Sequence, residues 1–257
     1  MKFRHWHPAL GALGVLVFIL SAQFHAAGQS RPRYKAVAFD YLVIFDANSV
    51  ASEVEKVFPG KSREFVSVWR NKQFEYCFLR SITDSYEDFY KVTGDALDFT
   101  ATQMHLQLTP DSRQRLLNAY THLTPWPDAI SGLKRLKAAG VRIITISNFT
   151  PTMLRANADN AGISDLFDEL VSTDVNHTFK PDPRAYQLGI DHLQLKKDEI
   201  VFAAFGSWDA YGATRFGFTT VWVNRFNLPA ERLGAVPDRT TNNMQDLVEF
   251  VLGNVAP

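Results

Sequence analysis

The sequence predicts an α/β protein with a parallel sheet and a separate helical segment inserted after the first strand. From Trp126 onwards, short apolar or β-branched runs alternate with segments of helical pattern, which is typical of a parallel sheet covered by helices on both faces. Between residues 49 and 121, by contrast, apolar residues recur at helical spacing, and no convincing strand pattern interrupts them.

Five apolar runs predict the strands of the sheet. The run "VRIITIS" is the most informative, because it shows no alternation of apolar and polar residues. A strand with that pattern is expected to be buried on both faces, as in a parallel sheet. The predicted strands are residues 34–39, 141–147, 168–172, 199–205 and 219–224.

Helices are predicted both in the insertion and between the later strands. Proline marks several of their beginnings, and Gly140 is expected to end the helix that starts after Pro127. The helices expected in the insertion are residues 49–58, 62–79, 85–106 and 110–123. Those expected in the core are residues 128–140, 151–161, 183–193 and 209–218.

The first 28 residues are predicted to be a signal peptide. Lys2 and Arg4 precede an apolar run from Ala9 to Leu20, and small residues follow it. The run is short for a transmembrane helix, although an uncleaved membrane anchor stays open as an alternative. We therefore expect an exported protein, either periplasmic or secreted.

The predicted organisation has three parts. Residues 1–28 form the signal peptide, residues 29–48 and 123–257 form the discontinuous α/β core, and residues 49–122 form a helical cap domain. The whole chain has 27 basic and 27 acidic residues, so no basic surplus predicts a nucleic-acid partner. The single cysteine, Cys77, permits no internal disulfide and is expected in the core.

Polar residues follow four successive predicted strands. Asp40 follows the first, Ser147 and Asn148 close the second, Lys180 lies in the loop after the third, and Asp209 lies after the fourth. Ligands of open α/β sheets bind outside the carboxyl ends of the strands, so these side chains are candidates for one site. Taken singly, each has a plainer explanation as a helix cap, a turn residue or a solvated lysine.

A fifth candidate comes from the insertion. Val66, Arg70, Phe74 and Cys77 share one face of a predicted helix, and Arg70 interrupts an otherwise apolar stripe. One explanation is an arginine whose stem packs on the core while its head reaches water. The alternative is a guanidinium aimed at the strand ends to hold an anion.

With these residues the chain resembles the haloacid dehalogenase (HAD) superfamily, and specifically its type II (S)-2-haloacid dehalogenases. The segments that carry the resemblance are "FPGKSREFVSVWRNKQFEYCFLRS", "ISNFTP", "FKPDPRAY" and "WDAYGATRFGFTTVWVNR". The family fold is a Rossmann-like core with a helical cap, which agrees with the pattern above.

The resemblance implies a reaction and a role for each candidate. Asp40 is expected to displace halide from C2 of a short 2-haloalkanoic acid and form an aspartyl ester, which water then hydrolyses. Lys180 is expected to keep Asp40 ionised, and Asp209 to hold Lys180 or to position the water. Substrate and halide contacts are expected from Ser147, Arg70, Asn148, Phe74, Phe89 and Trp208. The resemblance implies no cofactor and no metal, and homodimers are common in the family.

Two departures from the family pattern bear on the chemistry. The spacing from Asp40 to Asp46 is one residue shorter than the usual first motif, as in a subgroup with a shortened motif, and the familiar threonine is missing. Ala204 and Gly206 stand where related dehalogenases carry serine and asparagine. We therefore expect ester hydrolysis to be slower than displacement.

Two other functions stay open from the sequence. A phosphatase of the same superfamily needs Mg²⁺ and a second aspartate two residues after the nucleophile, a position that Leu42 occupies here. A non-catalytic homologue that binds small anions is the second alternative, because a fold does not fix a function.

Overall fold

The computed structural model describes Met1 and residues 34–253. The predicted signal peptide lies outside the described residues. Within the described part of the chain, no helix is both long and apolar enough to cross a membrane.

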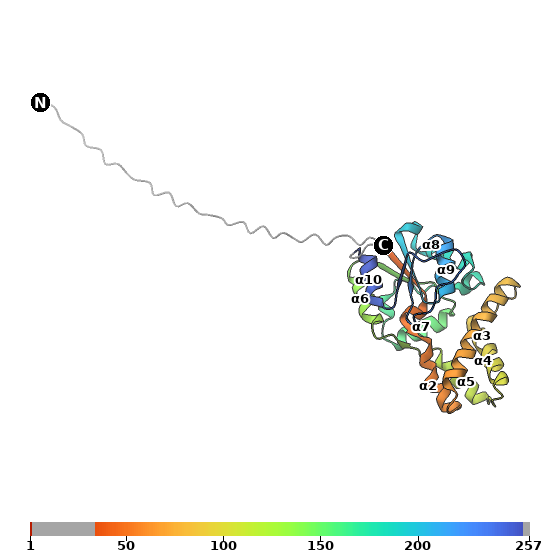
Figure 1. The fold of residues 1–257 in the computed structure, drawn as a ribbon. Coiled ribbons are helices and arrows are strands. Elements are labelled where there is room, and N and C mark those ends of the chain that lie inside the picture. The colour runs from red at the N-terminus through yellow and green to blue at the C-terminus, as the bar shows by residue number, and fades with distance from the viewer. Residues whose placement is uncertain (2–33, 254–257) are drawn as a thin grey trace. The chain divides into compact units, whose positions relative to one another are not determined.

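A parallel five-stranded sheet forms the centre of the core, in the order β4-β1-β5-β6-β7 (Figure 1). Its first strand reads AVAF and is buried along its whole length, so both of its faces are covered. The predicted α/β fold with a parallel sheet is therefore confirmed. The strands are β1 (Ala36–Phe39), β4 (Arg142–Thr145), β5 (Ile200–Ala204), β6 (Thr219–Val223) and β7 (Arg239–Thr241).

Helices cover both faces of this sheet. Because successive strand side chains point to opposite faces, Val37 and Phe39 pack in one hydrophobic cluster while Ala36 and Ala38 pack in another. The first cluster includes side chains of α6 (Ala129–Ala138), α7 (Pro151–Asn160) and α10 (Met244–Leu252). The second includes side chains of α8 (Pro183–Leu193) and α9 (Ser207–Phe216).

A helical insertion separates β1 from the rest of the core. It leaves and re-enters through a small antiparallel ribbon, in which β2 (Phe45–Asp46) pairs with β3 (Thr124–Pro125). Between the two ribbon strands every regular element is helical, as the apolar spacing predicts. These elements are η1 (Ala47–Val50), α2 (Ala51–Val57), α3 (Ser62–Ile82), α4 (Phe89–Gln103) and α5 (Pro110–Ala119).

The predicted strand at residues 168–172 is wrong. This segment makes only two isolated parallel bridges to the β4 edge, at Glu169 and Ser172. One reason is local: a side-chain oxygen of Asp168 accepts the backbone N–H of Ile143 at 2.6 Å, where a regular ladder would use a backbone carbonyl.

Other boundaries also differ from the prediction. The helix expected from Ser85 begins at Phe89, because Asp88 caps it by accepting the N–H of Lys91 at 2.8 Å. Strand β7 and helix α10 were not predicted, nor was the short helix α1 (Tyr41–Ile44). The remaining short elements are η2 (Ser164–Leu166), η3 (Thr173–Asn176) and η4 (Lys197–Glu199).

Gly132 offers a test of the packing between α6 and α10. A Cβ atom there would lie 2.1 Å from Cγ of Met244, which is fully buried. Gly132→Ala should therefore lower the free energy of unfolding by about 1–3 kcal/mol, although alanine ordinarily stabilises a helix interior by about 1 kcal/mol relative to glycine. Urea denaturation of both proteins measures the difference.

Gly94→Ala in α4 is the matched control. The nearest atom to its new Cβ is Nη2 of Arg113, at the far end of a flexible side chain that can move away. This variant should be as stable as the parent or slightly more stable. A Gly132→Ala protein with unchanged or higher stability would contradict the packing argument.

Candidate active site

Lys180 lies between two carboxylates at the carboxyl ends of the strands. Its ammonium donates to Oδ2 of Asp40 at 2.8 Å and to Oδ2 of Asp209 at 2.7 Å. Asp40 follows β1, and Asp209 lies in the first turn of α9, after β5. The side chain of Lys180 is only 2% exposed and that of Asp209 is fully buried, so this ion triad is shielded from solvent.

The triad holds one cation against two carboxylates, and the pKa values of the two carboxylates are shifted in opposite directions. Burial alone would raise the pKa of Asp40, but the charge of Lys180 and hydrogen bonds to the carboxylate lower it below its usual value. Burial raises the pKa of Asp209 to about 8, against the opposing charge of Lys180 and with further help from the charge of Asp40. Asp40 is therefore the more easily ionised of the two.

A backbone donor completes the surroundings of Asp40. Asp40 caps α1, and its Oδ1 accepts the N–H of Leu42 at 2.8 Å. Each carboxylate oxygen thus accepts one hydrogen bond and keeps a second lone pair. The carboxylate is held in a fixed orientation and still has electron pairs available for a reaction.

Tyr186 is a site residue that the sequence reasoning missed. Its hydroxyl donates to Oδ1 of Asp209 at 2.7 Å, and the side chain is fully buried on α8. One carboxylate oxygen of Asp209 consequently accepts a hydrogen bond from Lys180, and the other accepts one from Tyr186. The signal in the sequence was weak: a single hydroxyl on an otherwise apolar helix face, six residues after Lys180.

Ser147 and Asn148 lie after β4, beside the triad. Oδ1 of Asn148 accepts the backbone N–H of Lys180 at 2.9 Å, which fixes the loop that carries the lysine. Oγ of Ser147 accepts the N–H of Phe149 at 3.1 Å, so its own hydroxyl hydrogen is free to donate elsewhere. Both residues are buried and line the same small cavity as Asp40 and Lys180.

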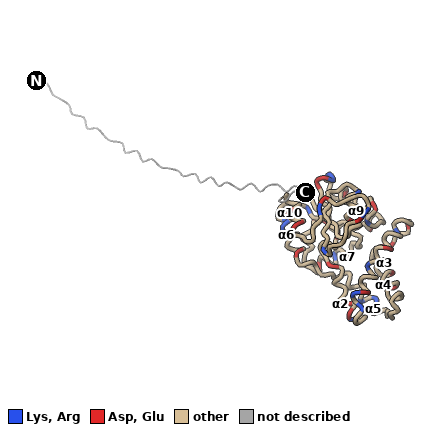
Figure 2. Tube along the Cα trace, viewed as in Figure 1, with Lys and Arg blue, Asp and Glu red and all other residues tan. Residues whose placement is uncertain are grey.

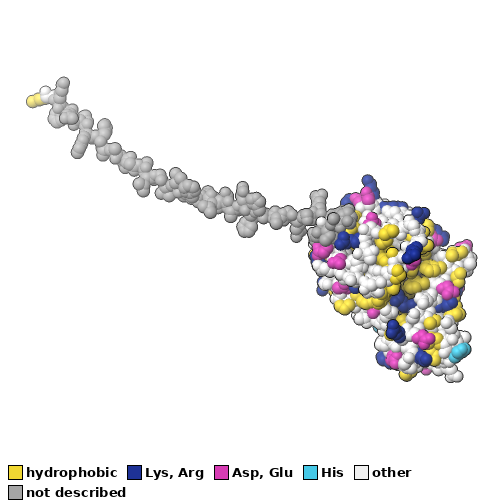
Figure 3. Space-filling view, in the orientation of Figure 1, with side chains coloured by type: hydrophobic (Ala, Val, Ile, Leu, Met, Phe, Trp, Pro, Cys, Tyr) yellow, Lys and Arg dark blue, Asp and Glu magenta, His cyan; other side chains and the backbone are white. Residues whose placement is uncertain are grey.

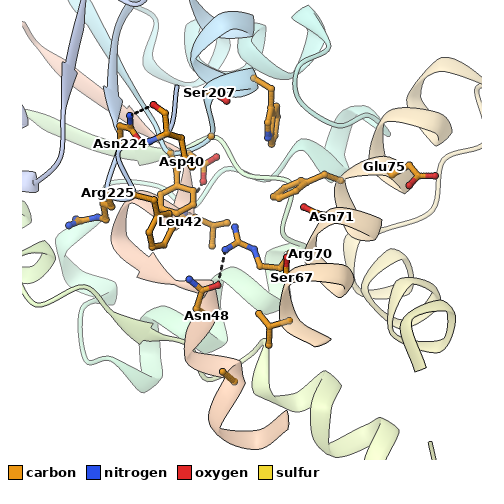
Figure 4. A pocket seen from close by; sticks show the side chains of 18 of the residues that line it. Asp40, Leu42, Asn48, Ser67, Arg70, Asn71, Glu75, Ser207, Asn224 and Arg225 are labelled. Carbon is orange, nitrogen blue, oxygen red and sulfur yellow. Dashed lines mark hydrogen bonds between the residues drawn. The ribbon is translucent and has the colours of Figure 1, made fainter. Parts of the chain in front are cut away.

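Arg70 faces the core from α3. Its guanidinium donates to Oδ1 of Asn48 at 3.2 Å and lies 5.8 Å from the ring centres of both Phe74 and Phe205 (Figure 4). No carboxylate among residues 34–253 forms an ion pair with it. Arg70 therefore brings a positive charge without an anionic partner to a cavity that Asp40 also lines.

Two adjoining cavities connect these residues. The inner cavity has a volume of about 20 Å³, about what one water molecule needs, and contains Ser147, Asn148, Lys180 and Phe89 in its wall. The outer cavity has a volume of about 1060 Å³ and contains Arg70. The wall shared by both cavities is made by Asp40, Leu42, Phe74 and Trp208.

The nine predicted site residues thus lie in or next to the walls of these two adjoining cavities. Eight of them line the inner or the outer cavity, whereas Asp209 lies behind Lys180 and lines neither. Among the described residues, no group of three or more His, Cys, Asp or Glu side chains is arranged to hold a metal ion. The ammonium of Lys180 occupies the position between the two carboxylates.

The comparisons with known proteins agree with this geometry. Residues 34–217 match the model of the haloacid dehalogenase-like hydrolase family. The chain belongs to this family. The resemblance inferred from the sequence is confirmed at this level.

Individual relatives are similar over nearly their whole length. The (S)-2-haloacid dehalogenase of Pseudomonas sp. (strain YL) is 38% identical over 84% of this chain and 94% of that protein. The L-2-haloacid dehalogenase of Xanthobacter autotrophicus, solved with chloropropionic acid covalently bound, superposes with a TM-score of 0.81 at 33% identity, covering 86% of this chain and 100% of that one. A HAD phosphatase from Thermococcus onnurineus shares the fold at 24% identity, with a TM-score of 0.58 over 85% of this chain and 98% of that one.

Removal of the Tyr186 hydroxyl tests the hydrogen-bond network behind the triad. In Tyr186→Phe, Oδ1 of Asp209 loses a donor that favours the ionised carboxyl, so the pKa of Asp209 should rise further above its usual value. A carbon-13 NMR titration of the aspartate carboxyl groups measures this shift.

Tyr120→Phe is the matched control. Its buried hydroxyl donates to Oε1 of Gln73 at 2.9 Å within the helical insertion, so its loss should cost stability without moving the titration of Asp209. An unchanged Asp209 titration in Tyr186→Phe would show that the 2.7 Å contact does not tune this carboxyl.

Proposed function

We propose that this protein is an (S)-2-haloacid dehalogenase, which hydrolyses the carbon–halogen bond of a 2-haloacid through an ester on Asp40. The observation that carries the proposal is the buried pair of Asp40 and Lys180. Asp40 lies in the wall shared by two cavities, of which the inner one is also lined by Lys180 and the outer one by Arg70, an arginine without an ion-pair partner among residues 34–253. The relatives' names and the covalent chloropropionic acid complex of a similar protein support the same reaction.

In the first step, an oxygen of Asp40 attacks C2 of the substrate. The new C–O bond forms as the carbon–halogen bond breaks, and the halide leaves with the bonding pair. A carboxylate is a weak nucleophile, so alignment and exclusion of water must supply much of the rate. The lowered pKa of Asp40 keeps it ionised, and its burial limits its hydration.

A hydroxyl group and a guanidinium group can bind the two anions of this step, the substrate carboxylate and the departing halide. The hydroxyl of Ser147 can donate to the substrate carboxylate from the inner cavity, and Asn148 lies beside it. Arg70, in the outer cavity, can take the departing halide. Phe74, Phe89 and Trp208 supply the apolar walls that surround C2.

In the second step, water attacks the ester carbonyl of Asp40, releases a 2-hydroxy acid and restores the carboxylate. Esterification removes the negative charge of Asp40, so the repulsion that helps to raise the pKa of Asp209 disappears. Asp209 then ionises more easily, with Lys180 as its counter-ion. Because Asp209 lines neither cavity, the proton of the attacking water passes to it through the ammonium of Lys180 and returns to the oxygen of the 2-hydroxy acid as the ester bond breaks.

The insertion acts as the cap of the enzyme in this proposal. Helix α3 contributes Arg70 and Phe74, so the substrate binds between residues 49–122 and the α/β core. The leader-like pattern of residues 1–28 supports export to the periplasm or the medium. A homodimer is the oligomeric state that we expect by analogy with the family.

Halide release in the presence of EDTA separates this function from its two rivals. We expect chloride release from 2-chloropropionate that EDTA does not reduce. Phosphate release that requires Mg²⁺ would support a phosphatase, which is less favoured because Leu42 occupies the position of the second aspartate. Binding of haloacid without release of halide would support the non-catalytic homologue.

Asp40→Asn should reduce halide release at least about a thousandfold while the fold is retained, because asparagine has nearly the same shape but is a poor nucleophile. Halide release and circular dichroism measure the two effects. Asp88→Asn, at the exposed cap of α4, should retain full activity, since asparagine caps a helix as well as aspartate does. Dehalogenation by an Asp40→Ala protein would refute the assignment of the nucleophile.

The ester should accumulate during turnover. Ala204 and Gly206 offer no polar side chain to order the attacking water, and both oxygens of Asp209 already accept hydrogen bonds. Rapid mixing with excess 2-haloacid should give a halide burst of about one equivalent, followed by slower release. A linear time course without a burst would mean that hydrolysis is not the slow step.

A further inference from the structure

The outer cavity is much larger than a short 2-haloacid requires. Its volume of about 1060 Å³ slightly exceeds the range of about 300–1,000 Å³ that is usual for sites of drug-sized ligands. Only one part of its wall carries Asp40, and the rest extends between α3 and the loops that follow β5 and β6. A propionate-sized substrate bound at Asp40 would leave most of this volume to water.

The walls of the outer cavity are rich in aromatic side chains. The five aromatic residues that line it are Phe74 and Phe78 on α3, and Phe205, Trp208 and Phe226 on the core. The ring of Trp208 lies 5.1 Å from that of Phe74 and 5.2 Å from that of Phe78, in tilted and edge-on arrangements. Aromatic rings favour such geometries with one another, so this wall is suited to receive another ring.

Gly206 explains how the indole of Trp208 reaches this position. A Cβ atom at residue 206 would lie 2.8 Å from Nε1 of Trp208 and 3.1 Å from its Cε2. The backbone of Gly206 has a negative φ of −80°, which any residue can adopt. Glycine is therefore required for space and not for backbone conformation, and it allows the indole to form the wall shared by both cavities.

The rim of the cavity presents apolar side chains to solvent on a well-braced loop. Phe226 is 46% exposed and Leu228 is 53% exposed. The side-chain amide of Asn224 bonds both the N–H and the carbonyl of Leu228, and Arg225 is tied to Asp128 at 2.9 Å. Figure 3 shows hydrophobic side chains gathered where the core meets the helical insertion. Because Phe226 and Leu228 both line the outer cavity, they continue its apolar wall to the surface, and contiguous apolar surface of this kind is typical of a binding groove.

We propose that the outer cavity binds an aromatic substituent on C2 of the substrate, so that the preferred substrates are 2-haloacids of the 2-halo-3-phenylpropionate class. This inference rests on the proposed dehalogenase function and deepens it. The carboxylate and C2 lie at Asp40, the halide leaves towards Arg70, and the phenyl ring lies among Phe78, Phe205 and Phe226. The phenyl ring of the substrate displaces water from the apolar walls of the outer cavity. This favours binding of a 2-halo-3-phenylpropionate over that of a short 2-haloacid.

The test compares two substrates of the full chain by bromide release. Each buried methylene-sized group strengthens binding about fourfold, the equivalent of ~0.8 kcal/mol. We therefore expect kcat/KM for (S)-2-bromo-3-phenylpropionate to exceed that for (S)-2-bromopropionate by at least about tenfold. Phe226→Ala removes a half-exposed ring from the rim and should lower this ratio at least about threefold.

Leu233→Ala is the matched control, because Leu233 is an apolar side chain of similar exposure, at 56%, that does not line the cavity. It should leave the ratio unchanged. A parent ratio of one or less would overturn the proposed substrate preference, as would an equal loss of the ratio in both variants or no loss in Phe226→Ala. Failure to release bromide from either substrate would instead refute the proposed function itself.

Discussion

The ion triad of Asp40, Lys180 and Asp209 is the interaction on which the site depends. It joins three segments that are distant in the sequence, with Lys180 and Asp209 shielded from solvent and the side chain of Asp40 10% exposed at the cavities. Removing one member of a buried ion pair typically costs about 3–5 kcal/mol, because the partner keeps its charge without compensation. In this protein Lys180 has two partners, so it both holds the strand-end loops together and allows a carboxylate to stay ionised in a buried position.

The fold supplies the geometry that the triad needs. Parallel strands bring their carboxyl ends to one edge, so β1 and β5 deliver the two carboxylates to the same place. The insertion then adds what the sheet cannot provide, a cation and aromatic rings that face the strand ends from α3. Away from the site, acidic and basic residues are interspersed over the core and the insertion (Figure 2). Within residues 34–253, Arg70 has no ion-pair partner, so its charge is available to an anion in the outer cavity.

The strand ends were predictable from the sequence because a parallel sheet leaves only one edge for the residues that follow its strands. This rule was enough to bring Asp40, Ser147 and Asp209 together, because they follow β1, β4 and β5. Lys180 was placed through the segment 168–172, which is not a strand but still runs parallel to the end of β4 through two isolated bridges. Tyr186 was not predictable in the same way, since its contact with Asp209 depends on how α8 packs against α9. At the predicted strand 168–172, a side-chain oxygen of Asp168 accepts the backbone N–H of Ile143 in place of a backbone carbonyl, and a hydrophobic pattern carries no information about such a competitor.

The pH dependence of ester formation in Lys180→Ala tests the central claim most directly, that Lys180 keeps Asp40 ionised. Without the ammonium, burial remains and raises the pKa of Asp40, so a more alkaline solution is needed to form the nucleophile. Single-turnover halide release, measured across a range of pH, should therefore reach half of its maximal rate at a higher pH in the variant than in the parent. A profile that keeps its midpoint while the rate falls would contradict the claim and would leave Lys180 with a structural role alone.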